Sequence, residues 1–114
     1  TDLWALKSVV HELGHAYHKE NWAENQPDIL AAWRHALEQK LYRDVNDDKG
    51  RVIPAAYALT NPLEYFAELT ALYFARGNYA PFDRKGLRAY DPAGYAMIEK
   101  LWGLSKAGSP LRDR

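Results

Sequence analysis

The chain contains no cysteine among its 114 residues. Disulfides and thiolate metal ligands are therefore excluded, and any metal ion must be held by nitrogen and oxygen atoms. Net charge is also lacking, because 15 basic residues balance 15 acidic ones. A protein without a global field is not drawn to nucleic acid or to an anionic membrane, so we expect neither as a partner.

Long hydrophobic runs and targeting signals are missing as well. No stretch approaches the roughly 18 consecutive apolar residues of a membrane span, and the start "TDLWALKSVV" has neither an initiator Met nor the basic region of a signal peptide. We therefore expect a fragment of a longer protein. Apolar residues make up 47% of the chain, which is enough to fold one domain, predicted over residues 1–104 with a flexible tail at 105–114.

Hydrophobic periodicity predicts a mostly α-helical fold of about four helices with little or no sheet. An apolar stripe on the first helix, residues 2–20, is predicted to face the core, and its members are Leu3, Leu6, Val10, Leu13 and Tyr17. The other predicted helices cover residues 28–44, 62–76 and 92–102. Between them, residues 51–60 are predicted to be extended, with Pro54 excluding a central strand, and residues 79–86 to form a loop.

The stretch "VVHELGHAYH", residues 9–18, contains three of the four histidines. On a helix, His11 and His15 lie about 40° apart, away from the apolar stripe, with Glu12 beside them. This HExxH spacing is typical of two imidazoles that bind one zinc ion next to a general base. A solvated helix face that is rich in histidine is the alternative. His18 is not expected to be a ligand, because it lies roughly 10 Å from His11 along the helix axis.

A second motif, "PLEYFAELTALYFA" at residues 62–75, is apolar around most of its circumference, and Glu64 and Glu68 are its only charged residues. A buried carboxylate must be paired, protonated or bound to metal. One arrangement accounts for both motifs: Glu64 completes a zinc site with His11 and His15, and Glu68 accepts a hydrogen bond from a ligand imidazole.

Two other interpretations of these glutamates remain open. Glu64 has the spacing of a capping-box residue that reaches back to Asn61. Alternatively, Glu64 and Glu68 pair with residues of the helix at 28–44 in an interaction domain that binds no metal, with the candidate partners Arg34, His35 and Lys40.

The segments "HELGHA" at 11–16 and "YALTNPLEYFAE" at 57–68 resemble the zinc endopeptidases of the anthrax lethal factor type and the similar Pro-Pro endopeptidases, which are gluzincins. The resemblance covers about residues 3–76. It implies secretion, a zincin-like helical core and a site made of the zinc ligands His11, His15 and Glu64, the general base Glu12, the active-site hydroxyl of Tyr57 and the outer carboxylate Glu68. Family members place a small sheet before the HExxH helix, and we expect this fragment to lack it.

The predicted function is therefore a zinc-dependent endopeptidase that hydrolyses a protein or peptide substrate with a zinc-activated water and with Glu12 as general base. A non-catalytic helical interaction module braced by the same zinc site is the first alternative. An interaction domain without metal is the second.

Overall fold

The computed structural model describes residues 3–104 and confirms the mostly α-helical fold. Its elements are α1 (Leu3–Asn21), α2 (Pro27–Glu38), β1 (Arg43–Asn46), β2 (Val52–Ala55), the 3₁₀ turn η1 (Tyr57–Leu59), α3 (Pro62–Phe74), α4 (Arg84–Tyr90) and α5 (Pro92–Leu101). The five α-helices exceed the expected number by one. The predicted tail at 105–114 and the first predicted helical position lie outside the described residues.

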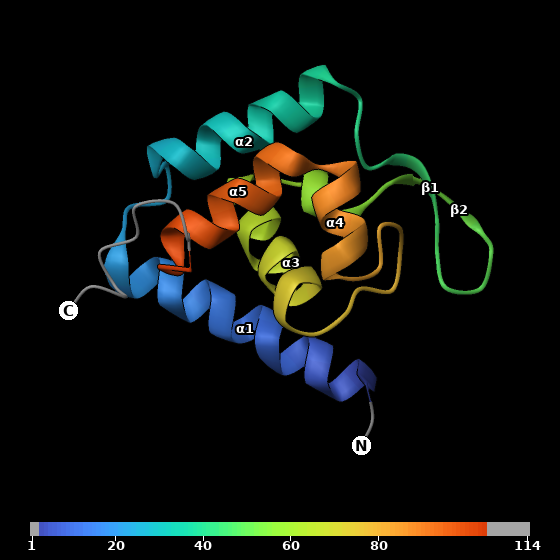
Figure 1. The fold of residues 1–114 in the computed structure, drawn as a ribbon, viewed down its shortest axis with the longest axis horizontal. Helices are drawn as coiled ribbons and strands as arrows, with labels where there is room; N and C mark the ends of the chain where they lie inside the picture. The colour runs from blue at the N-terminus through green and yellow to red at the C-terminus, as the bar shows by residue number, and fades with distance from the viewer. Residues whose placement is uncertain (1–2, 105–114) are drawn as a thin grey trace.

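Helix α3 is the centre of the fold, and the other helices pack around it (Figure 1). Every residue from 65 to 73 is buried, as the apolar circumference of this segment predicts. Its start is fixed by Asn61, whose side-chain oxygen accepts a hydrogen bond from the amide of Glu64, and by Pro62 in the first turn. The predicted start of this helix is confirmed.

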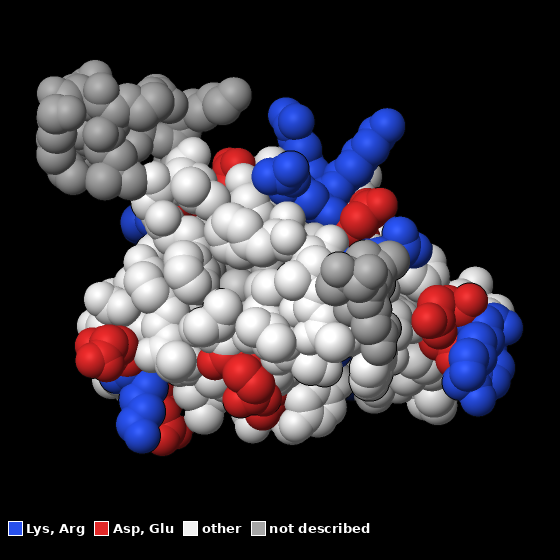
Figure 2. Space-filling view, turned by 90° about the horizontal axis from the view of Figure 1, so that it is seen from below, with Lys and Arg blue, Asp and Glu red and all other residues white. Residues whose placement is uncertain are grey.

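The apolar stripe on α1 faces the core only in part: Tyr17 is partly buried and packs against the core, but for Leu6 and Leu13 the prediction is wrong. Leu6 and Leu13 are 42% and 57% exposed, and Val9 beside them is 56% exposed. Viewed from the side of α1, the molecule has a largely uncharged central area, with charged side chains mostly toward its edges (Figure 2). The opposite side of α1, which carries the histidines, packs against α3 instead.

The close approach of α1 to α3 depends on Gly14. A β-carbon at this position would lie 3.1 Å from the α-carbon of Ala67 and 3.3 Å from the β-carbon of Thr70. These distances are shorter than ordinary van der Waals contact, so a side chain at this position would push the two backbones apart by a few tenths of an ångström. The glycine of the HELGH motif thereby brings the histidines of α1 within reach of α3.

Helix α2 ends at Glu38, six residues before the predicted end at residue 44. The chain then passes through Lys40 and Tyr42, whose φ angles are 58° and 63°. A left-handed backbone at these positions cannot continue a right-handed helix. The left-handed residue Lys40, just after the C-cap Gln39, ends the helix, and the chain then turns so that Tyr42 is fully buried.

Of the segment predicted to be extended, Val52–Ala55 forms the second strand of an antiparallel hairpin, whereas Tyr57–Leu59 forms the 3₁₀ turn η1, so the prediction is wrong there. Strands β1 and β2 pair with Arg43 opposite Ala55 and Val45 opposite Ile53. Pro54 is tolerated because β2 has a partner on only one side, as expected of a proline in a sheet edge.

Helix α4 was not predicted, since its first residues fall in the segment expected to be a loop. Asp83 begins it by accepting a hydrogen bond from the amide of Gly86. Asp91 caps the following helix, α5, by accepting from the amide of Gly94; it is completely buried and also accepts hydrogen bonds from the hydroxyls of Tyr42 and Tyr65. None of the helices within residues 3–104 has the length and apolarity needed to cross a membrane.

Candidate metal centre

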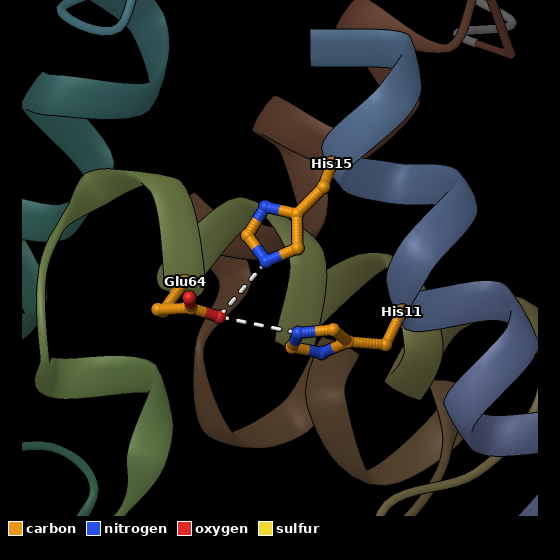
Figure 3. Close-up of side chains that lie close together, drawn as sticks. All are labelled: His11, His15 and Glu64. Atoms are coloured by element: carbon orange, nitrogen blue, oxygen red, sulfur yellow. Dashed lines mark hydrogen bonds and ion pairs between the residues drawn. The ribbon is translucent and has the colours of Figure 1, made fainter. Parts of the chain in front are cut away.

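Two histidines of α1 and one glutamate of α3 converge on a single point (Figure 3). The Nε2 atoms of His11 and His15 lie 3.1 and 3.0 Å from the same oxygen of Glu64. One ligand atom from each of the three residues lies within 4.8 Å of the other two. Within residues 3–104, this is the one group of His, Asp and Glu side chains with such a geometry. These three residues could hold a metal ion.

The backbone and the side chain of Glu64 have separate roles. Its amide donates to Asn61 at the start of α3, at 2.8 Å, whereas its carboxylate contacts the two imidazoles. Asn61 therefore caps the helix by accepting from the Glu64 amide, whereas the Glu64 carboxylate, which the capping-box interpretation directs back to Asn61, contacts the two histidines. Figure 3 shows one oxygen of the Glu64 carboxylate pointing toward both imidazole rings.

Glu68, one turn further along α3, is 1% exposed and has three hydrogen-bonding partners. Its Oε2 atom accepts from Lys7 at 3.0 Å and from His11 Nδ1 at 2.6 Å, and its Oε1 atom accepts from the hydroxyl of Tyr79 at 2.6 Å. The suggested pairing of the two glutamates with α2 is wrong, because both carboxylates are engaged by α1 and, for Glu68, also by Tyr79.

These contacts shift the pKa values of the His11–Glu68 pair in opposite directions. The hydrogen bond to Glu68 is the main cause that raises the pKa of His11, and it outweighs the effect of burial. Burial alone would raise the pKa of Glu68, but the hydrogen bonds from His11 and Tyr79 and the charge of Lys7 lower it overall. Glu68 is therefore ionised at neutral pH and can hold the Nδ1–H group of His11.

The donor set fits a metal ion of the zinc type. A ligand histidine commonly donates its second N–H group to a carboxylate, which fixes the tautomer and orients the ring. His11 has this arrangement, with Nδ1 on Glu68 and Nε2 facing Glu64. Two imidazole nitrogens and one carboxylate oxygen are also the protein ligands of a zinc site that keeps one position open.

His18 lies outside this group, as the helix geometry predicts. Its Nε2 atom lies 3.0 Å from the carbonyl oxygen of Ala23, and its ring packs edge-on against Phe66, with 5.5 Å between ring centroids. The side chain is buried in the packing between α1 and α3.

Glu12 and Tyr57 flank the candidate metal centre. Both are exposed, and both line a surface cavity of about 160 Å³ together with His11 and Glu68. Tyr57 belongs to η1, and its ring centroid lies 6.2 Å from that of His11. The negative charge of Glu64 is the main cause that raises the pKa of Tyr57, so its hydroxyl keeps its proton at neutral pH.

Two contacts of the site were not predicted from the sequence. Lys7 lies one turn before His11, so the helical period that pairs the histidines also places Lys7 on their face. Tyr79 has no comparable signal, because it lies in the segment after α3 and reaches Glu68 only through the tertiary fold.

Comparison with known proteins finds no relative of this chain. No protein-family model, no curated protein and no solved structure matches the chain.

Proposed function

We propose that this chain is the catalytic core of a zinc-dependent endopeptidase. The main support for the proposal is the convergence of His11, His15 and Glu64. In addition, the buried carboxylate of Glu68 accepts a hydrogen bond from Nδ1 of His11. A helix face that is merely solvated has no need of a buried carboxylate to orient a histidine. The HExxH spacing favours zinc over other metals that accept nitrogen and oxygen ligands.

The residues around the metal centre supply the groups that peptide hydrolysis needs. A bound zinc ion would polarise the substrate carbonyl and lower the pKa of a water molecule. Glu12 accepts a proton from the attacking water and returns it to the leaving nitrogen. Tyr57 stays protonated and donates a hydrogen bond to the oxyanion that develops on the substrate. These roles of Glu12 and Tyr57 follow from the motif resemblance and from their position on the same cavity.

Space for a substrate adjoins the candidate metal centre. A second cavity, of about 410 Å³, shares Lys7, Tyr57 and Glu68 with the first and extends to Ile53 and Ala55 of β2. Two neighbouring surface cavities that share lining residues suit an extended peptide better than a small metabolite, whose site usually encloses it.

The test of this proposal is Glu12→Gln, with Glu20→Gln as the matched control on the exposed surface of the same helix. Zinc content and cleavage of a fluorogenic peptide library are measured for the unmutated chain and both variants. We expect Glu12→Gln to bind zinc normally and to lose at least about 100-fold in kcat, the usual contribution of a general base. Glu20→Gln should resemble the unmutated chain.

Two results would contradict the proposal. Cleavage by Glu12→Gln at the unmutated rate would remove Glu12 from the mechanism. Absence of cleavage by a zinc-loaded and folded chain would favour the second candidate function, a helical interaction module that is braced by zinc. The exposed stripe of Leu6, Val9 and Leu13 on α1 favours this candidate, because such a patch can bind another protein.

A further inference from the structure

We propose that Tyr79 is a positioning residue that fixes two parts of the candidate site at once, the imidazole of His11 and the turn that carries Tyr57. The inference rests on the proposed zinc site. It goes beyond that site because it assigns a role to a residue outside both sequence motifs.

The first link runs from Tyr79 to His11 through Glu68. The hydroxyl of Tyr79 donates to Oε1 of Glu68 at 2.6 Å, while His11 and Lys7 use the other oxygen, Oε2. With hydrogen-bond partners on both oxygens, the buried carboxylate cannot rotate without breaking a short hydrogen bond. The orientation of the carboxylate in turn sets the direction of the Nε2 atom of His11.

The second link runs from Tyr79 to η1. The amide of Ala58 donates to the hydroxyl of Tyr79 at 3.3 Å. Ala58 is buried and directly follows Tyr57, whose side chain is exposed at the cavity. A displacement of the Tyr79 hydroxyl would therefore affect the backbone of the turn that presents Tyr57.

Tyr79 itself is held firmly. Its side chain is 3% exposed, and its backbone forms an isolated antiparallel bridge with Asp47. The neighbouring amide of Ala80 donates to the carbonyl of Asn46 at 2.8 Å. Burial, together with the charge of Glu68, raises the pKa of Tyr79 well above its ordinary value, so the hydroxyl remains a donor. A rigid support of this kind suits a residue that orients others.

The chain offers a matched control for the test. Tyr65 is also buried and also donates to a buried carboxylate, Asp91, at 2.6 Å, but this contact belongs to the packing around α5. Tyr79→Phe and Tyr65→Phe thus remove the same kind of hydrogen bond from two different places. A purely structural role would give the two variants the same behaviour toward metal.

The experiment measures the zinc dissociation constant by chelator competition, the visible absorption spectrum of the cobalt-substituted protein, and the thermal unfolding of the metal-free protein. We expect Tyr79→Phe to weaken zinc binding about 10-fold and to alter the cobalt bands, the size of effect known for residues that orient metal ligands. Tyr65→Phe should leave both unchanged, even if its Tm falls. In a Glu68→Gln background, Tyr79→Phe should have little further effect on zinc binding.

If the unmutated chain binds zinc and Tyr79→Phe has the same zinc affinity and cobalt bands, the role of Tyr79 is overturned, but the proposed zinc site is not. If the unmutated chain binds no zinc, the proposed function and this role fall together. Should Tyr79→Phe not fold, a ring-fluorinated tyrosine at position 79 keeps the ring and the hydroxyl but changes its donor strength. Cobalt bands that do not respond to that replacement would equally contradict the proposal.

Discussion

The Nδ1 atom of His11 lies 2.6 Å from Oε2 of Glu68, although 57 residues separate the two positions in the chain. This contact joins the HExxH helix to the buried central helix and leaves Nε2 of His11 directed at Glu64. It gives the candidate metal centre its orientation, and it also contributes to the packing of α1 on α3.

Replacement of Glu68 should therefore damage both stability and metal binding. Glu68→Ala removes the partner of Lys7, His11 and Tyr79, which leaves buried donors without an acceptor. We expect the free energy of unfolding to fall by about 3 kcal/mol and zinc affinity to fall at least about 10-fold. Urea denaturation and chelator competition measure the two effects. Glu38→Ala, at the exposed end of α2, is the control; equal effects in both variants would contradict this account.

The His11–Glu68 pair predicts a specific pH dependence for the metal-free protein. Since the pKa of His11 is raised above 6.5, its contribution to stability is complete below about pH 6.5 and is lost as pH rises through the raised value. Since the pKa of Glu68 is lowered below 4.5, its contribution is complete above about pH 4.5 and is lost as pH falls through the lowered value. The pair should therefore stabilise the fold most between these limits.

Whereas the metal-free protein should lose the stabilising contribution of His11 as pH rises, the stabilisation by bound zinc should increase. A ligand histidine must be neutral, so the rise in Tm that zinc causes should grow as pH increases from about 5.5 to about 7.5. Thermal unfolding with and without zinc, extended on the acid side to about pH 3, measures both the pH dependence of the pair and the effect of zinc. A zinc-dependent rise in Tm that is the same at about pH 5.5 and about pH 7.5 would show that His11 is not a ligand.

Gly14→Ala tests the close approach of α1 to α3. On an isolated helix this substitution would stabilise by up to about 1 kcal/mol, but here the new methyl group would lie 3.1 Å from the α-carbon of Ala67. Because a backbone atom cannot move aside cheaply, we expect a net loss of about 1 to 2 kcal/mol and weaker zinc binding. Ala16→Gly, on the exposed side of the same helix, shows the propensity effect alone. A gain in stability for Gly14→Ala would refute the proposed packing.

Asp91→Ala should separate stability from the metal site. The carboxylate of Asp91 caps the N-terminus of α5 and accepts hydrogen bonds from the hydroxyls of Tyr42 and Tyr65 at 2.8 and 2.6 Å. Its removal leaves two buried hydroxyls without their acceptor, so the free energy of unfolding should fall by about 3 kcal/mol. Zinc affinity, measured well below the Tm of the variant, should stay within about 2-fold of the unmutated value. A larger loss would mean that the site depends on the core around α5.

Local signals in the sequence were sufficient for most helix boundaries and for the candidate ligands. Asn61 with Pro62 and Asp91 with Pro92 predict the starts of α3 and α5 because capping depends on neighbouring residues only. The spacing of His11 and His15 follows from the helical period. Their contact with Glu64 could be predicted because Glu64 and Glu68 are the only charged residues of a buried helix, and a buried carboxylate needs a partner.

The features that were missed depend on tertiary contacts. Leu6 and Leu13 form an apolar stripe that periodicity assigns to the core, yet the glycine and the histidines of α1 pack more closely on α3. Helix α2 ends where the backbone turns left-handed at Lys40 and carries Tyr42 into the core, and the backbone of Tyr79 pairs with the hairpin at Asp47. Such long-range contacts leave no periodic trace in a single sequence.

The most direct test of the central claim is the zinc content of the purified chain by elemental analysis, after folding with zinc and removal of the excess. The unmutated chain and His35→Ala, which changes an exposed histidine outside the site, should each retain about one zinc ion, as a His₂Glu site requires. His11→Ala and Glu64→Ala should each lose it while remaining folded by circular dichroism. No zinc in the unmutated chain, or zinc retained by both site variants, would contradict the metal centre on which the proposed function depends.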